Sequence, residues 1–330
     1  MANKKEAYLY LSAMLRAREP KLLNRDKAER MLDAATFEEA AKLLTDCGYP
    51  DMSQLNADEI DEALAQHRAD IYGELERMCN DKSIVDVFKV KYDYHNAKAI
   101  IKSEAMGTDA AYLMSGSGRI KPDELLTNYN EERYNLIPEA LGSAMREAKE
   151  TLARTANPQL ADFVLDRAYY KELLQSAEKS GNEFLKGYVQ LLIDTANLKS
   201  SIRTARMHKN QDFLREVLID GGATGVERII SSGGPENLAP LYAHTVLEKA
   251  AELGTVAAEG GTMTAFELAC DNAVNSYLSN AKLVSYGEET VIAYMAAVET
   301  EITVIRMILT SKLAGIDADA IRERLRDLYA

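Results

Sequence analysis

Three segments of this 330-residue chain carry the same polar signature within an apolar helical pattern. In each segment an acidic residue is followed, five places later, by a basic residue. The three acid–base pairs are Asp93 and Lys98, Asp194 and Lys199, and Glu301 and Arg306. The acids are 101 and 107 residues apart (194 − 93 and 301 − 194). Because self-similarity at a nearly fixed period indicates repeated structural units, the chain is predicted to contain three such units.

The positions around each acid also match. Asn96 and Asn197 follow the first two acids by three residues, whereas the third segment has Val304 at this position. Apolar residues recur nine, six and three residues before each acid and four and eight residues after it. They are Ile84, Val87, Val90, Ala97 and Ile101; Leu185, Tyr188, Leu191, Leu198 and Ile202; and Ile292, Met295, Val298, Ile305 and Leu309. At about 100° per residue these positions share one broad face of an α-helix, which predicts a long signature helix in the core of each unit.

The composition favours an all-α fold. Helix-forming residues dominate most of the sequence, Pro is scarce at 7 residues, and Trp is absent. Long stretches of alternating β-branched residues do not occur. Each unit is predicted to begin with short helices and to end with its signature helix. Breaks at Gly-rich segments place the units at about residues 1–110, 111–215 and 216–330.

The charge of the chain narrows the classes of partner. The formal net charge is −13 and the isoelectric point is about 5.0. This balance argues against a nucleic-acid-binding protein, which needs a basic face, and against adhesion to anionic lipid through a basic patch. Charged residues interrupt the N-terminus, so we expect no signal peptide, and the apolar run 291–298 is too short to span a bilayer. Three unpaired cysteines fit a reduced, cytoplasmic environment.

Candidate chemical sites are weak. The Gly-rich segments 115–118 and 221–225 could offer backbone N–H groups to a phosphate. Neither ends in the Gly-Lys-Ser/Thr of a phosphate-binding loop, so both are interpreted as loops that connect helices. The four histidines lack metal-binding spacing, and His95 lies on a different helix face from Asp93. The sequence therefore predicts no catalytic residue, no cofactor-binding residue and no metal ligand.

The basic residues of the signatures lie on the apolar side of their helices. Taking each acid as 0°, the apolar positions span about 40° to 180° and the base lies near 140°. Either the basic side chains extend along apolar surface to water, or they pair with acids of the same unit. For the second alternative, Asp166 would serve Lys199 and Asp271 would serve Arg306. The sequence offers no equally clear acid for Lys98.

Several motifs together resemble one known family. They are the Asp-x-x-Asn-x-Lys signatures, the Leu-Asp-Arg-Ala-Tyr-Tyr segment at 165–170, the Tyr8-Leu9-Tyr10 segment and the stretch from Val90 to Asn96. With these motifs the chain resembles, over nearly its whole length, the C subunit of the archaeal and bacterial V/A-type rotary ATPases, which is related to the d subunit of the eukaryotic V-ATPases. The third signature departs from the pattern, with Glu301 for Asp and Val304 for Asn.

The resemblance implies a funnel of three similar helical lobes related by a pseudo-threefold axis. Such a protein is non-catalytic, needs no cofactor, and couples the central shaft, built from D-type and F-type subunits, to the membrane-embedded proteolipid ring. It would be a peripheral part of a hetero-oligomeric complex at the cytoplasmic face of the membrane, without insertion into lipid. Structural or interface roles would then fall to the signature residues and their candidate partners. These are Asp93, Asn96, Lys98, Asp166, Asp194, Asn197, Lys199, Asp271, Glu301 and Arg306.

Two other functions remain open from the sequence. A helical-repeat scaffold for other cytoplasmic partners would have the same repeats without any rotary complex. An α-helical enzyme with an unrecognised site would show turnover by itself. Co-purification distinguishes them, because a rotor component would travel with the ring and shaft subunits from solubilised membranes.

Overall fold

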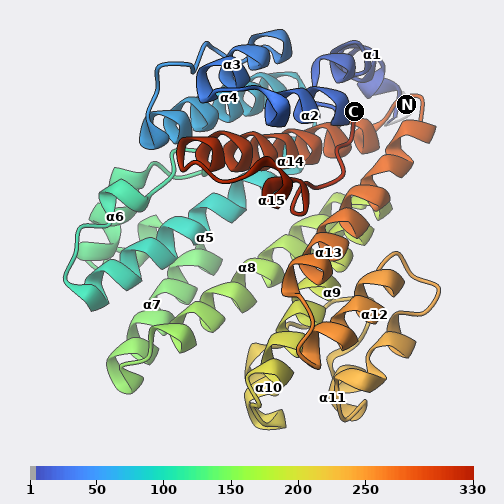
Figure 1. The fold of residues 1–330 in the computed structure, drawn as a ribbon. Coiled ribbons are helices and arrows are strands. Elements are labelled where there is room, and N and C mark those ends of the chain that lie inside the picture. Colours follow the sequence, from blue (N-terminus) through green and yellow to red (C-terminus); the bar gives the residue numbers. More distant parts are fainter. Residues whose placement is uncertain (1–4) are drawn as a thin grey trace. The chain divides into compact units, whose positions relative to one another are not determined.

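The computed structural model describes residues 5–330, and these residues form helices and loops without a β-strand (Figure 1). The predicted all-α class is therefore confirmed. The α-helices are α1 Leu9–Arg18, α2 Arg25–Asp33, α3 Phe37–Lys42, α4 Ala57–Met78, α5 Ser83–Met106, α6 Pro122–Asn130, α7 Glu139–Thr155, α8 Pro158–Ser180, α9 Glu183–Arg206, α10 Gln211–Val217, α11 Val226–Ser231, α12 Glu248–Ala258, α13 Met263–Ser279, α14 Glu288–Leu313 and α15 Ala318–Arg322. Short 3₁₀ helices occupy several of the connections.

The three signatures lie on the long helices α5, α9 and α14. Each of these helices is the last of a run of four consecutive α-helices. The three runs are α2 to α5, α6 to α9 and α11 to α14. Local sequence sets many of the boundaries: Asn24, Asn56 and Asn157 accept backbone N–H bonds at the starts of α2, α4 and α8.

The chain divides into two compact units. One comprises the residues up to 85 together with 205–207 and 232–330, and the other comprises residues 86–204 and 208–231. Each unit therefore joins segments that are distant in the sequence.

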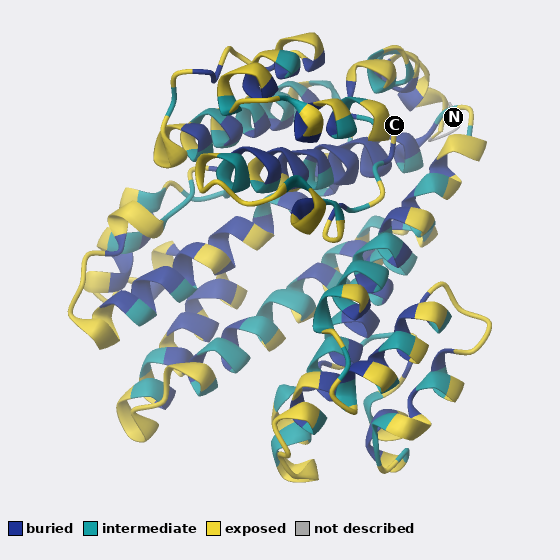
Figure 2. Cartoon of the chain, viewed as in Figure 1, coloured by how far each residue is buried: buried dark blue, intermediate teal, exposed yellow. Residues whose placement is uncertain are grey.

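In the first unit α14 forms the centre of the core. It contacts α1, α2, α3, α4, α13 and α15. All residues from Val291 to Val298 are buried, on every side of the helix, as the dark colouring of α14 in Figure 2 shows. A helix that is apolar all round is stable only when neighbours cover each of its faces, and the surrounding helices provide this cover.

In the second unit α7 and α8 pack along each other as a hairpin. The two helices bury Leu141, Met145, Leu165 and Leu173. The connection is short, and Ala156 adopts a left-handed conformation with φ of 53° at the end of α7. Asn157 then caps α8 by accepting a hydrogen bond from the Gln159 N–H at 3.0 Å.

The apolar face predicted for the signature helices is confirmed. Of the fifteen matched apolar residues, fourteen are buried and Tyr188 is half-buried. The signature acids Asp93, Asp194 and Glu301 are buried as well. Within residues 5–330 the structure has no helix that is both long and apolar enough to cross a membrane.

Candidate functional site

Asp93 holds the loop that leads into α6. Its Oδ1 atom accepts the backbone N–H of Arg119 at 2.8 Å and that of Ile120 at 3.2 Å, while Oδ2 accepts the Arg119 side chain at 2.6 Å. The Arg119 guanidinium also donates to Glu172 on α8 at 2.7 Å. A buried carboxylate that receives several hydrogen bonds is compensated for the loss of water. Burial nevertheless raises the pKa of Asp93 above its usual value, against the lowering effect of Arg119.

Asp194 on α9 does the same for the loop that leads into α11. Its carboxylate accepts the backbone N–H of Ala223 at 3.1 Å and that of Thr224 at 3.0 Å. Burial raises the pKa of Asp194 to about 6, although the bonds from the Thr224 and Ala223 N–H groups act in the opposite direction.

The two signature asparagines fix the same loops a few residues earlier. Asn96 donates to the Ser115 carbonyl at 2.9 Å and accepts the Ser115 N–H at 2.7 Å. Asn197 makes the same two bonds to Ile219, at 2.7 and 2.8 Å. An asparagine side chain has an NH₂ donor and a carbonyl acceptor. It can therefore bond both the C=O and the N–H of one residue in an extended peptide, as a neighbouring strand would. We call each acid and asparagine pair, together with the loop it holds, a signature clamp.

Glycine is required where the clamps close. A β-carbon added at Gly118 would overlap the Asp93 Oδ1 atom, and one added at Gly222 would overlap Asp194 Oδ1. The Gly-rich segments are therefore loops whose backbone approaches a buried carboxylate. The N–H groups that bind the acids belong to Arg119 and Ile120, directly after the first of these segments, and to Ala223 and Thr224 in the second.

The third signature helix holds the N-terminal part of the first unit. Glu301 accepts the Leu23 N–H at 2.6 Å and the Tyr49 hydroxyl at 2.6 Å. Leu23 lies two residues before α2, as Ile120 lies two residues before α6 and Thr224 two before α11. Burial raises the pKa of Glu301 to about 7, although the bonds from Tyr49 and Leu23 act in the opposite direction.

The departures of the third signature have physical reasons. Glu301 is one methylene longer than Asp, and two residues before the bonded Leu23 lies Lys21, where the other two loops have Gly118 and Gly222. Val304 is buried where the other helices have Asn. Five residues before Leu23, at the place of Ser115 before Ile120 and of Ile219 before Thr224, lies Arg18, the last residue of α1, whose backbone is helical. No extended peptide is present there for an asparagine to pair with.

The structure corrects both predicted ion pairs. Asp166 pairs with Lys98 at 2.5 Å and has no bond to Lys199. Asp271 pairs with Arg326 at 2.7 Å, and Arg306 pairs with Asp61 on α4 at 2.5 Å.

The signature bases Lys98 and Arg306 each reach an acid of another run of helices. Lys98 on α5 reaches α8, and Lys102 on the next turn reaches Asp162 at 2.7 Å. Asp166 lies in the second predicted unit, and Asp61 lies in the first, opposite Arg306 of the third.

The pairs are also less buried than expected. The side chains of Lys98 and Asp166 are 27% and 37% exposed, and those of Arg306 and Asp61 are 58% and 40% exposed. Lys199 is half-buried. The alternative in which the basic side chains extend to water thus describes Arg306 better than a buried pair does.

His95 is exposed and bonds to the carbonyl of Leu113, the last residue of a short 3₁₀ helix, at 2.9 Å. Residues 5–330 contain no group of three or more His, Cys, Asp or Glu side chains that could hold a metal ion. Asp93, Asp194 and Glu301 instead hold loops onto helices.

Sequence reasoning missed several partners of the signature residues. Arg119, Tyr49 and Asp61 carry no repeat signal, because each belongs to one run of helices only. A signal for the clamps was present in the two glycines, which follow their acids by 25 and 28 residues (118 − 93 and 222 − 194). The partners of the glycines became visible only when the loops were placed on the helices.

Comparison with known proteins gives matches along nearly the whole chain. A family model described as ATP synthase (C/AC39) subunit matches residues 11–324. The C subunit of the V-type sodium ATPase of Enterococcus hirae is 22% identical over 98% of this chain and 99% of its own length. The C subunit of the A-type ATP synthase of Methanocaldococcus jannaschii is 24% identical over 97% of this chain and 86% of its own. That of Haloquadratum walsbyi is 26% identical, over 95% and 96%.

Proposed function

The chain belongs to the ATP synthase (C/AC39) subunit family, and we propose that it is the non-catalytic central-stalk subunit of a V/A-type rotary ATPase. In this role it is a socket that couples the rotating shaft to the membrane ring during ATP-linked ion transport. The observation that carries the proposal is the family match over residues 11–324, with relatives that it spans almost from end to end. The same match favours this function over a scaffold for unrelated partners.

The chemistry of the buried polar groups supports a mechanical role. Asp93, Asp194 and Glu301 each bind backbone N–H groups, and each thereby fixes a loop to a long helix. A part that carries torque needs loops that do not slip along its helices. Hydrogen bonds in a buried site resist such slipping, because breaking them leaves unsatisfied polar groups away from water.

We further propose that the chain forms three lobes, at residues 1–110, 111–215 and 216–330, about a pseudo-threefold axis, in the shape of a funnel. The clamps support this arrangement. Asp93 and Asp194 each hold the loop before the first helix of the following run, and Glu301 holds the loop before α2. The helices α5 and α9 thus each bind the loop that begins the next run of helices. In the same way, α14 binds the loop that begins the first run.

The proposed partners are the shaft subunits of the D and F types and the proteolipid ring, within a hetero-oligomeric complex. The chain would lie at the cytoplasmic face of the membrane as a peripheral component. Its acidic surface, with a net charge of −13, favours protein partners over direct contact with anionic lipid.

Deletion of the gene for this chain tests the proposal. We expect ATP-driven ion transport in membrane vesicles to be lost, while the catalytic head still hydrolyses ATP, because torque no longer reaches the ring. Complementation with the wild-type chain should restore transport. ATP-driven transport at the wild-type rate in the deletion strain would overturn the assignment. A purified chain that brings down proteins other than ATPase subunits would favour the scaffold.

A further inference from the structure

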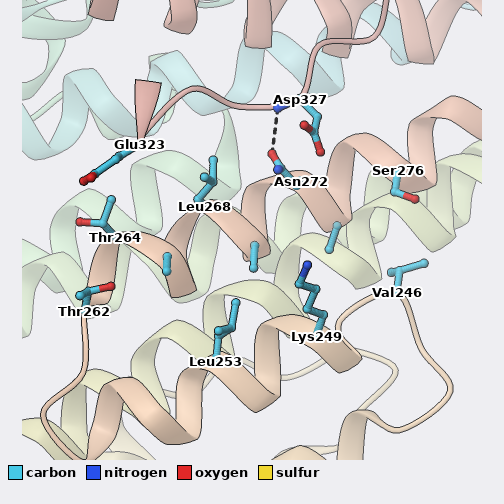
Figure 3. A pocket seen from close by; sticks show the side chains of 13 residues that line it. Val246, Lys249, Leu253, Thr262, Thr264, Leu268, Asn272, Ser276, Glu323 and Asp327 are labelled. Carbon is cyan, nitrogen blue, oxygen red and sulfur yellow. Dashed lines mark hydrogen bonds between the residues drawn. The ribbon is translucent and has the colours of Figure 1, made fainter. Parts of the chain in front are cut away.

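An open groove of about 710 Å³ runs between α12, α13 and the C-terminal segment (Figure 3). Leu253 and Lys249 line it from α12, Leu268 and Ala269 line it from α13, and Asp327 comes from the C-terminal segment. A volume of this size is enough for several large side chains. Its lining is mostly apolar, and the charged groups come from α12 and from the C-terminal segment.

The matching face of α8 is covered by a helix of this chain. The sequences align Asp166-Arg167-Ala168 of α8 with Asp271-Asn272-Ala273 of α13, so Phe163 matches Leu268. Phe163 packs edge-on against Phe213 of α10, with ring centres 5.9 Å apart. Arg167 donates to the Glu216 carbonyl in the last turn of α10 at 2.7 Å. A short helix thus occupies this position on α8.

On α13 the same face is only partly covered. The Asn272 side chain, which matches Arg167, accepts the Asp327 N–H at 2.9 Å, as the dashed line in Figure 3 marks. The C-terminal segment therefore covers the Asn272 end, and Leu268 is left lining the groove.

The residues on the floor of the groove are smaller than their counterparts. Leu160 and Val164 of α8 are matched on α13 by Ala265 and Ala269, both of which line the groove. Alanine at these positions lets the side chains or backbone of a second helix approach α13 closely.

Three charged side chains in the groove lack an ion-pair partner within residues 5–330. Lys249 belongs to α12, whereas Glu323 and Asp327 belong to the C-terminal segment, so opposite charges lie on different walls. Elsewhere in the same unit acids and bases pair readily, as Arg326 does with Asp271. An occupant with a complementary pattern of charge would pair with all three.

We propose that this groove binds one amphipathic helix of a neighbouring subunit of the rotary ATPase, in the position that α10 occupies on α8. The inference rests on the proposed function, which supplies the neighbouring subunits. A large apolar side chain of the helix packs over Ala265 and Ala269 against Leu268. An acidic residue of the helix faces Lys249, and a basic residue faces Glu323 and Asp327. Anchors three or four residues apart are the usual pattern of such helix-in-groove binding.

Photo-crosslinking in the intact ATPase tests the inference. A photoreactive benzoylphenylalanine replaces Val246, which lines the groove, and in a control chain it replaces Val256, which is 57% exposed and does not line it. We expect the probe at Val246 to form an adduct with an amphipathic helical segment of another ATPase subunit, identified by mass spectrometry. The control probe should not label that segment.

A filling substitution provides the second measurement. In the chain with the probe at Val246, Ala269→Trp should lower the yield of the adduct about tenfold or more, the change expected from a loss of about 1.4 kcal/mol of binding free energy. Val256→Phe, outside the groove, should leave the yield unchanged. Circular dichroism and thermal melting of both variants report whether the chain still folds. The double reversal Lys249→Glu with Glu323→Lys should also lower the yield without filling the groove.

The outcomes separate the inference from the function. If the chain purifies with the ATPase but the Val246 probe labels no other ATPase component, or labels only a second copy of this chain, the inference is wrong and the function stands. An unchanged yield in a folded Ala269→Trp variant would also overturn the inference. If the chain does not purify with the ATPase at all, the proposed function itself fails.

Discussion

Asp93, Asp194 and Glu301 are buried acids that bind the protein's own backbone, and a glycine allows the approach in two of the three cases. In the third case the acid is the longer Glu301, and the loop has Lys21 at the position that matches the two glycines. At the scale of single residues, the geometry of the clamps and the protonation of the acids both have measurable consequences.

Replacement of the glycine in the first clamp is predicted to lower the stability of the folded chain. Gly118→Ala places a β-carbon on the Asp93 carboxylate, so the loop or the acid must move and its hydrogen bonds weaken. We expect a loss of about 1–3 kcal/mol in the free energy of unfolding, typical of overpacking at a close contact. The matched control is Gly116→Ala in the same loop, where a β-carbon meets nothing within 4 Å. Denaturant titration measures both variants, and equal stability of the two would contradict the explanation.

Glu301 is predicted to make stability depend on pH. Its pKa in the folded chain is about 7 against an ordinary value of 4.5, so between these values the folded state holds a proton that the unfolded state has lost. The contribution of Glu301 to stability is therefore full below about pH 4.5 and is lost as the pH rises through 7. Comparison with Glu301→Gln isolates this contribution. The difference in unfolding free energy between the two chains should change by up to about 3 kcal/mol from pH 5 to pH 8.

Other titrating groups near neutrality remain in both chains and cancel in this comparison. Asp194, with a pKa of about 6, contributes with the same sign as Glu301. His67 stacks on Tyr49, and burial lowers its pKa, so it contributes with the opposite sign. Lys27 lies close enough to Glu301 to favour its ionised form. A difference between the wild-type chain and Glu301→Gln that is the same at pH 5 and at pH 8 would show that Glu301 does not hold its proton.

At the scale of helices, the ion pairs between α5 and α8 and between α14 and α4 are exposed to solvent at least in part. A double-mutant cycle of Lys98→Met with Asp166→Asn should give a coupling energy of about 1 kcal/mol or less, because water screens the pair. The cycle of Arg306→Met with Asp61→Asn should give no more, since its side chains are more exposed. Thermal melting of the single and double variants measures both. A coupling of about 3 kcal/mol would instead indicate a buried pair.

At the scale of the whole molecule, the three runs of helices differ in how their third helix is covered. Helix α10 covers α8 through Phe213 and the Glu216 carbonyl, whereas α13 is covered at one end by the C-terminal segment. Repeated units need not keep every contact, since each repeat can release a face for another partner while its core remains intact. The groove on α13 is the place where this chain departs most clearly from its own repeat.

The sequence by itself determined the helical class, the three signature helices and their buried faces. These depend on residues three or four places apart, which any helix brings together, as Ile84, Val87 and Val90 illustrate. It also marked Asp93, Asp194 and Glu301 as equivalent positions. Only the tertiary structure decided what these residues bind.

Lys98 reaches Asp166, Arg306 reaches Asp61, and the Asp93 carboxylate meets the backbone beside Gly118. Such pairings depend on which helix packs against which and on where each loop crosses. The sequence prediction failed here because it looked for partners within one unit, whereas these bases face a helix from another unit. The periodicity of one helix specifies which side is covered, but it does not specify the element that covers it.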